Sequence, residues 1–191
     1  MHHNTEISNP LLVIVGMAGS GKSSVARHLE QKGWRVIRFG ALTMRELESR
    51  HLPINESNER AVREELRAKN GMDAYAKLSL PAIVENLSVG PTAIDGLYSW
   101  AEYKFLRHHF RNRMRAIAIF TTRSVRYARL SQRPDRPLLI EEAEQRDYAE
   151  IENVEKAGPI AIADYIIVND GSIEDLFSAV DRLLSTLYST S

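Results

Sequence analysis

The sequence predicts an α/β doubly wound domain, and three observations support this fold class. Five short apolar runs have the composition of strands, and several are nearly continuous in Val, Ile and Ala, as is typical of strands buried on both faces of a parallel sheet. Helical patterns separate these runs, which favours helical crossovers between parallel strands. The length of 191 residues suits a single domain, residues 1–191, in which helices cover both faces of the sheet.

The strands and helices are expected in a regular alternation along the chain. The strands are Leu11–Val15, Arg35–Phe39, Thr92–Asp95, Ala116–Thr121 and Tyr165–Val168. The helices are Lys22–Gln31, two or three within Leu42–Leu87, then Ala101–Arg111, Arg123–Gln132, Leu139–Asn153, a short one around Pro159–Ala163, and Ser172–Leu187. The helical insertion, at about 42–90, is a candidate cover for a substrate. The basic, proline-marked stretch SQRPDRPLL, within about 130–150, is typical of an exposed loop or lid.

Composition and charge exclude several classes of protein. The formal net charge is zero, so the chain lacks a general affinity for polyanions and we expect no nucleic-acid partner. There is no cysteine, which excludes disulfides and thiolate metal sites and fits a reducing compartment. The N-terminus lacks a secretory pattern, and no apolar run approaches the ~18 residues of a membrane span. We therefore expect a cytoplasmic protein with no membrane partner, either a monomer or a homodimer.

The turn after the first strand has the composition of a phosphate-binding loop. The segment GMAGSGKS, residues 16–23, satisfies the pattern G-x-x-x-x-G-K-[ST] and lies between an expected strand and an expected helix. Its glycines allow the backbone to wrap around a phosphate, and N–H groups at the helix N-terminus then point at the anion. Lys22 can reach the β- and γ-phosphates, and the Ser23 hydroxyl can ligate Mg²⁺. The residues expected to bind the nucleotide here are Gly16, Ala18, Gly19, Ser20, Gly21, Lys22, Ser23 and Ser24.

The rest of the chain narrows the kind of nucleotide-binding protein. GTP-dependent switch proteins usually carry an N-K-x-D element after a later strand, whereas this chain has TTRSVR and VNDGS at the two candidate places. A large mechanical ATPase needs more chain than this. A small kinase fits the length best, and the missing guanine element favours ATP over GTP.

With these residues the chain resembles the P-loop nucleotide kinases, which include the nucleoside monophosphate kinases and the dephospho-CoA kinases, and it is most similar to the adenylate-kinase-related proteins. The resemblance runs from Leu11 to about Leu184. It depends on the phosphate-binding loop and on the segments TAIDGLYSWAEYKFLRHHF, IAIFTTRSVRYARLSQR and ADYIIVNDGSIEDL. It implies a three-layer P-loop kinase fold with a five-stranded parallel sheet, a helical acceptor-binding insertion and a short lid that carries arginines.

The resemblance implies catalytic roles outside the loop. Asp95 would lie beside the loop, where it would hold the water shell of Mg²⁺ or accept a proton from an acceptor hydroxyl; an Asp-Gly turn is the alternative. Arg129 and Arg133 match the R-x-x-x-R element where the lid begins. Together with Arg136 they would contact the ATP base and the transferring phosphoryl group, and a solvated helix face is the alternative for each. The residues expected to act in catalysis are Lys22, Asp95, Arg129, Arg133 and Arg136.

Acceptor-binding positions match the family less closely. Gly40 and Arg45 resemble the G-D-x-x-R element that holds an acceptor nucleotide, but Ala41 replaces the acid and the arginine lies one residue further on. Gly96 would let the acceptor approach the backbone. Tyr98 occupies the position where monophosphate kinases often place an arginine, so it would stack on a ring or line an apolar pocket.

A few positions carry weaker expectations. Asn169 follows the last strand near the place where relatives hold the ATP base, although Asn-Asp-Gly is also good turn chemistry. Arg123 and Arg126 could simply cap or solvate their helix. Arg146 lies on the next helix, from which a lid arginine returns to the phosphates in relatives. The run of mixed charges at residues 59–69 is typical of an exposed helix.

Together these features predict an ATP-dependent phosphotransferase that moves the γ-phosphoryl group of Mg²⁺-bound ATP to a small nucleotide-like acceptor, with a nucleoside monophosphate favoured. Dephospho-CoA is an alternative acceptor, and its hydroxyl would need a base such as Asp95. The alternative from another class is a nucleotide-dependent regulatory ATPase, in which ATP switches a surface for a partner. The lid arginines and Asp95 argue against it, since a protein that only binds nucleotide does not need them.

Overall fold

The computed structural model describes residues 9–134 and 137–188, and one parallel sheet lies at its centre. The strands are β1 (Leu11–Val15), β2 (Arg35–Arg38), β3 (Thr92–Asp95), β4 (Met114–Phe120) and β5 (Tyr165–Val168). They lie in the order β2-β3-β1-β4-β5, and every neighbouring pair is parallel. The predicted five-stranded parallel sheet is confirmed. The direction of the strand order changes at β1, which is where open α/β sheets bind ligands at their carboxyl edge.

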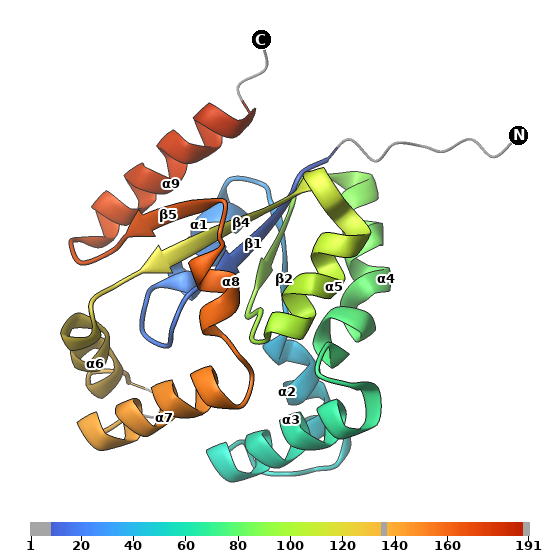
Figure 1. Ribbon diagram of the computed structural model, residues 1–191, viewed down its shortest axis with the longest axis vertical. Coiled ribbons are helices and arrows are strands. Elements are labelled where there is room, and N and C mark those ends of the chain that lie inside the picture. The colour runs from blue at the N-terminus through green and yellow to red at the C-terminus, as the bar shows by residue number, and fades with distance from the viewer. Residues whose placement is uncertain (1–8, 135–136, 189–191) are drawn as a thin grey trace, which may run out of the picture.

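Helices cover both faces of the sheet (Figure 1). They are α1 (Lys22–Gln31), α2 (Gly40–Ser49), α3 (Glu56–Asn70), α4 (Ala74–Val89), α5 (Trp100–Phe110), the 3₁₀ turn η1 (Arg111–Arg113), α6 (Arg123–Ser131), α7 (Ile140–Glu152), α8 (Ala157–Ala161) and α9 (Ile173–Tyr188). α1 and α9 lie on one face, and α4, α5 and α8 lie on the other, which gives three layers. Among the described residues no helix is long and apolar enough to cross a membrane.

The two faces of β1 contribute to two separate apolar cores, because successive side chains of a strand point to opposite faces. Leu11, Val13 and Val15 pack beneath α4 and α5. Leu12 and Ile14 pack beneath α1 and α9. Every residue of this strand is buried, which explains why its sequence, LLVIV, is apolar without interruption.

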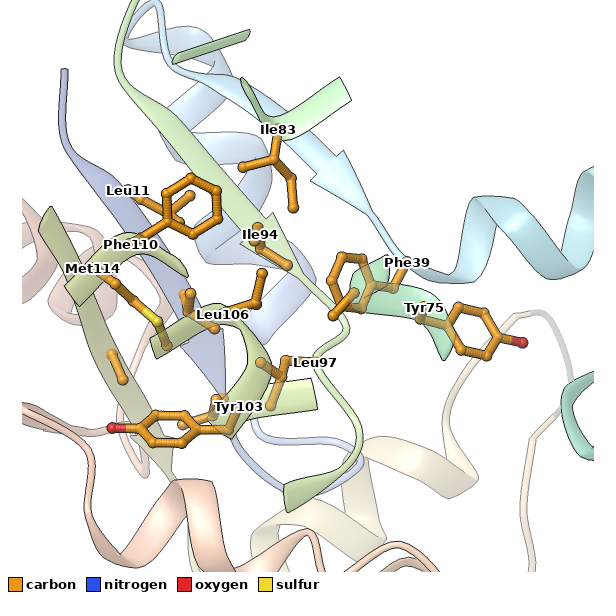
Figure 2. Packing of buried hydrophobic residues seen from close by; sticks show 14 of the residues in the cluster. Leu11, Phe39, Tyr75, Ile83, Ile94, Leu97, Tyr103, Leu106, Phe110 and Met114 are labelled. Carbon is orange, nitrogen blue, oxygen red and sulfur yellow. The ribbon is translucent and has the colours of Figure 1, made fainter. Parts of the chain in front are cut away.

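The larger core also fixes the helical insertion to the sheet (Figure 2). The rings of Phe39 and Tyr75 stack with their centroids 6.4 Å apart, so the end of β2 contacts the start of α4. The hydroxyl groups of Tyr75 and Thr43 share a buried hydrogen bond of 2.6 Å, which joins α4 to α2. Apolar contacts therefore pack the insertion against the sheet, and a polar contact joins two of its helices.

Some strands and helices begin or end one or two residues away from the predicted bounds. β4 ends at Phe120 rather than Thr121, since the Thr121 hydroxyl lies 3.1 Å from the carbonyl oxygens of both Ser20 and Asn169. β4 also begins two residues early, at Met114. α5 begins at Trp100 because the preceding serine and Glu102 form a capping box.

The expectation that residues 59–69 form an exposed helix is wrong for one face of α3. Val62 and Leu66 are 1% and 9% exposed, and Glu59 is 7% exposed. Their spacing places them on one side of the helix, which packs against the rest of the insertion. Charged residues at neighbouring positions hide this short apolar stripe in the sequence.

Candidate active site

The phosphate-binding loop joins β1 to α1 and takes a shape that requires its glycines. Gly16, Gly19 and Gly21 have φ angles of 148°, 80° and 101°, a region that favours glycine. A Cβ atom on Gly16 would lie 2.5 Å from the carbonyl oxygen of Ile119, and one on Gly19 would lie 2.8 Å from that of Arg126. Both contacts are with backbone atoms, so these glycines allow β4 and α6 to pack against the loop.

Carbonyl groups of the loop are bonded outward, whereas several of its N–H groups are left without an acceptor. The side-chain amide of Asn169 donates to the carbonyl oxygen of Ser20 at 2.8 Å, and Nη1 of Arg126 donates to that of Ala18 at 3.0 Å. In the part of the chain that the structure describes, no acceptor is present for the backbone N–H groups of Gly19, Gly21 and Lys22. Unbonded N–H groups before a helix N-terminus form an anion site, so the loop is preorganised for a phosphate.

Lys22 follows the loop, and its ammonium group bends back against it. Nζ donates to the carbonyl oxygen of Met17 at 2.8 Å. Burial, and after it the positive charge of Lys156, lowers the pKa of Lys22 from 10.5 to about 7. The negative charges of Glu150 and Asp95 oppose this shift, and a polyphosphate beside the ammonium group would add to their effect.

Ser23 and Asp95 have the oxygen donors that a magnesium ion needs. Ser23 lies exposed in the first turn of α1. Asp95 ends β3 next to Ile14 of β1, and it is 8% exposed. Neither side-chain oxygen has a hydrogen-bond partner among the residues described, so both are available to an ion or to its water shell. Because Mg²⁺ is held by one or two such oxygens together with phosphates and waters, these residues fit the ion.

Tyr98 lies across the two glycines that are expected to line the acceptor site. A Cβ atom on Gly96 would lie 3.3 Å from the Tyr98 ring, and one on Gly40 would lie 3.9 Å from its hydroxyl. Burial, and then the negative charge of Asp95, raises the pKa of Tyr98 to about 12. The structure thus brings these predicted residues together, whereas Arg45 is exposed on α2.

A cluster of charged residues acts on Lys22, and only one of them, Arg146, is marked by the sequence. Lys156 is 2% exposed, and its Nζ donates to Oε2 of Glu150 at 2.6 Å. Arg146 donates from Nε to Oε1 of the same carboxylate at 3.2 Å. Although burial raises it, the positive charges of Lys156 and Arg146 lower the pKa of Glu150 to about 2. The charges of Lys156 and Arg146 also act on Lys22, so both belong to the surroundings of the loop.

Arg126 is the arginine of α6 that contacts the loop. It is 6% exposed, and it bonds both carboxylate oxygens of Asp147 on α7, at 2.9 and 2.5 Å, as well as the carbonyl oxygen of Ala18. The interpretation of Arg126 as a solvated or capping residue is therefore wrong. The sequence shows only that Arg126 lies on the predicted lid helix. It does not show that the side chain is buried, because the carboxylate that pairs with it is 21 residues away.

The remaining predicted residues lie around the loop that follows β5 and beyond α6. Arg129 donates to the carbonyl oxygens of Asn169 at 3.0 Å and of Gly171 at 3.3 Å. It thus contacts the loop that follows β5. Asn169 is 4% exposed, and its side-chain amide supports the phosphate-binding loop. Arg133 is exposed just beyond α6, and Arg136 lies outside the described residues.

A pocket of about 230 Å³ opens beside the loop. Its lining comes from the loop, the end of β4, α6 and α8, and consists of Met17, Ser20, Ile119, Phe120, Thr121, Arg123, Arg126 and Ile160. The loop therefore borders open space on the side of the lid helices.

Residues 12–153 match a family model described as an AAA domain. A UPF0200 protein from Pyrococcus furiosus is 33% identical over 182 residues, which cover 93% of this chain and 97% of the relative. The chain belongs to the UPF0200 family. A UPF0200 protein from Sulfurisphaera tokodaii is 31% identical over 181 residues, with 93% of this chain and 97% of the relative covered.

Solved structures share the fold of this UPF0200 protein at low sequence identity. The structure of TT1252 from Thermus thermophilus has a TM-score of 0.67 at 22% identity and covers 94% of this chain and 98% of its own. A shikimate kinase from Acinetobacter baumannii, bound to shikimate, has a TM-score of 0.60 at 19% identity, with 96% and 97% covered. A gluconokinase from Sinorhizobium meliloti has a TM-score of 0.55 at 19% identity, with 95% and 97% covered. The predicted P-loop kinase-like fold is confirmed.

Proposed function

We propose that this UPF0200 protein is an ATP-dependent phosphotransferase that moves the γ-phosphoryl group of ATP to a small acceptor. One observation carries the proposal: a preorganised phosphate-binding loop with its lysine lies next to a buried carboxylate, that of Asp95, at the ends of adjacent strands. Such a carboxylate can accept the proton of an acceptor hydroxyl or hold the water shell of Mg²⁺. The P-loop kinase-like fold supports the same reaction type.

Some residues of the site would bind the phosphates of ATP, and another would accept a proton from the acceptor. The unbonded N–H groups of the loop bind the phosphates of ATP, and Lys22 balances the negative charge that spreads over the phosphoryl oxygens. The acceptor oxygen forms a bond to the γ-phosphorus while the bond from this phosphorus to the β-phosphate oxygen breaks, which leaves ADP. Where the acceptor is a hydroxyl, its proton passes to the carboxylate of Asp95. Mg²⁺, held at Ser23 and Asp95, would neutralise phosphate charge.

The two lid helices, α6 and α7, are held next to the phosphate-binding loop, where they would exclude water from the site. Arg126 ties α6 to the loop through the carbonyl oxygen of Ala18, and Asp147 ties α7 to α6. Water excluded from the loop cannot compete with the acceptor for the phosphoryl group.

A nucleoside monophosphate is the favoured acceptor because a cation of the insertion acts on the Tyr98 ring, which lies across the glycines of the expected acceptor site. The positive charge of Arg63 acts on Tyr98 and on Tyr75. Such surroundings suit a phosphate attached to a flat base.

The second candidate is an acceptor that reacts through a hydroxyl group. The carboxylate of Asp95 favours it, because a hydroxyl needs a base to take its proton. A monophosphate acceptor is already ionised and needs no base, whereas a hydroxyl acceptor does. Dephospho-CoA is the nucleotide-like acceptor of this kind. Shikimate, which is bound to one of the similar structures, is a polyhydroxy acid of this kind.

A coupled assay of ADP release tests the proposal. Purified protein with Mg²⁺ and ATP is screened against nucleoside monophosphates, dephospho-CoA, shikimate and gluconate. We expect one acceptor class to stimulate ADP release well above the rate without acceptor. Slow hydrolysis that no acceptor changes would argue instead for the regulatory ATPase.

A further inference from the structure

One edge of the sheet, formed by β5, is left open. Among the described residues β5 pairs with β4 alone, and Figure 1 shows it on the side of the sheet away from β2. The backbone N–H group of Asn169 donates to the carbonyl oxygen of Phe120 at 2.7 Å, so Asn169 and, by alternation, Ile167 direct their backbone groups toward β4. The backbone N–H and C=O groups of Ile166 and Val168 therefore point away from the sheet.

The two edges of the sheet differ in how they are protected. Unpaired edges attract other strands, and proteins usually block them with charged side chains or proline. β2, at the opposite edge, begins and ends with an arginine, and Arg38 is paired with Glu30 at 2.7 Å. β5 has the sequence YIIV, which contains neither a charge nor a proline. The composition of β5 therefore leaves its edge open to another strand.

Apolar side chains lie exposed beside this open edge. Ile166 and Val168 are 62% and 65% exposed on one face of β5, and Phe120, which lies next to Val168 in the register with β4, is 50% exposed. A groove of about 300 Å³ runs along the same strand between β5 and α9, and the helix residues that line it include Ala179 and Arg182. Neighbouring apolar side chains that stay exposed are typical of a surface that binds another protein.

The strand is complementary to a second copy of itself. If two β5 strands pair antiparallel about a two-fold axis at Ile167, Ile166 of each strand lies opposite Val168 of the other. These are the residues whose backbone groups point outward, so they form the hydrogen-bonded pairs of an antiparallel ladder. Their side chains are apolar and would cover each other across the two strands.

The side of α9 that faces the groove is complementary to itself in charge. Asp175, Ala179 and Arg182 follow helical spacing, so they lie on one side of α9. Arg182 is exposed, and its guanidinium group has no carboxylate partner within the described ranges of the chain. Because two α9 helices would run antiparallel across the same axis, Asp175 of each copy would approach Arg182 of the other. An interface between identical subunits related by a two-fold axis requires a surface that matches itself in this way.

We propose that β5 is a dimer interface, at which a second copy of this chain adds its own β5 antiparallel and joins the two sheets into one. The inference goes beyond the proposed function and does not depend on it. Because the paired strands run in opposite directions, the carboxyl edges of the two sheets face opposite ways. The two candidate active sites therefore lie at opposite edges of the joined sheet.

Sedimentation velocity over a range of protein concentrations tests this inference. We expect the native chain to associate into a dimer of twice the 21.7 kDa of the monomer. Ile166→Lys changes an exposed side chain of the monomer but buries a charge among apolar groups in the dimer, so it should weaken association at least ~10-fold. Val89→Lys is the matched control, because Val89 is also 62% exposed but ends α4, which packs on β2 and β3. It should dimerise like the native chain.

Substitutions of Arg182 test the antiparallel arrangement. Arg182→Glu places like charges opposite each other and should weaken the dimer ~10-fold or more, whereas Arg182→Gln removes only the attraction and should weaken it less. A native chain that stays monomeric up to ~1 mM would overturn the inference, since even weak interfaces associate at that concentration. A dimer that survives Ile166→Lys would overturn it too, because its interface would lie elsewhere. A dimer that Arg182→Glu leaves unchanged would contradict the antiparallel arrangement.

Discussion

A carboxyl group close to the site, that of Glu102, lies in surroundings that disfavour its charge. Glu102 is fully buried, and its Oε2 accepts the backbone N–H groups of Tyr98 and Ser99 at 2.8 and 3.1 Å. Its other carboxylate oxygen is buried without a partner among the described residues. Burial raises the pKa of Glu102 from 4.5 to about 7, against the effect of these hydrogen bonds. The residue that caps α5 and holds the backbone of Tyr98 is therefore only partly ionised near neutral pH.

Glu102 should give the protein a stability that falls as the pH rises from about 4.5 to 7. Over this window the unfolded chain loses a proton that the folded chain retains, so the free energy of unfolding decreases by up to ~3 kcal/mol. The groups that face Glu102 are Arg67 and Lys156, whose positive charges limit the rise, and Tyr75. Glutamine keeps one oxygen for the backbone N–H groups and has no proton to lose.

Urea unfolding of the native chain and of Glu102→Gln at pH 5 and pH 8 measures this contribution. We expect the variant to lose less stability than the native chain between the two pH values. The same loss in both proteins would mean that Glu102 ionises normally in the folded state.

Among the secondary-structure elements, the two lid helices act as one unit. The side chains of Arg126 on α6 and Asp147 on α7 are 7% and 9% exposed, and Tyr127 adds a third bond to the same carboxylate at 3.2 Å. Because Arg126 also bonds the carbonyl oxygen of Ala18, α7 is coupled to the phosphate-binding loop through α6. The lid should therefore respond as a whole when this ion pair is changed.

Asp147→Asn should destabilise the protein because it leaves the buried guanidinium of Arg126 without a counterion. Breaking one side of a buried ion pair costs about 3 kcal/mol, which corresponds to a decrease in Tm of roughly 6–12 °C for a chain of this size. The double substitution Arg126→Met/Asp147→Leu removes both charges and should recover most of this loss. Thermal unfolding followed by circular dichroism measures both. A single variant that melts with the native chain would show that the pair does not hold the lid.

Over the whole molecule, the sequence predicts the sheet better than the site. Short runs rich in apolar residues mark strands, so β1, β3 and β5 are found at their predicted bounds, although only β1 and β3 are buried along their whole length and Ile166 and Val168 of β5 are exposed. The phosphate-binding loop is local, so its pattern of residue types is sufficient to identify it. In contrast, the burial of Arg126 and Lys156 depends on carboxylates of α7 that a sequence does not place in space. The end of β4 at Phe120 likewise depends on contacts of Thr121 across the fold.

The architecture brings these distant segments to one edge of the sheet. The loop after β1, the end of β3, the lid helices and the turn before α8 are separated along the chain and meet around Lys22. This convergence is what a transfer reaction between two bound molecules requires, because both reactants must be held in line and kept from water.

The destination of the transferred phosphate tests the central claim most directly. The native protein is incubated with Mg²⁺ and ATP labelled in its γ-phosphate, together with the mixture of candidate acceptors, and the labelled products are separated. The account predicts that label appears in one organic acceptor and that Lys22→Met lowers its rate of appearance by ~100-fold or more, since that charge stabilises the transferring group. Label recovered only as inorganic phosphate, at a rate that no acceptor alters, would contradict it.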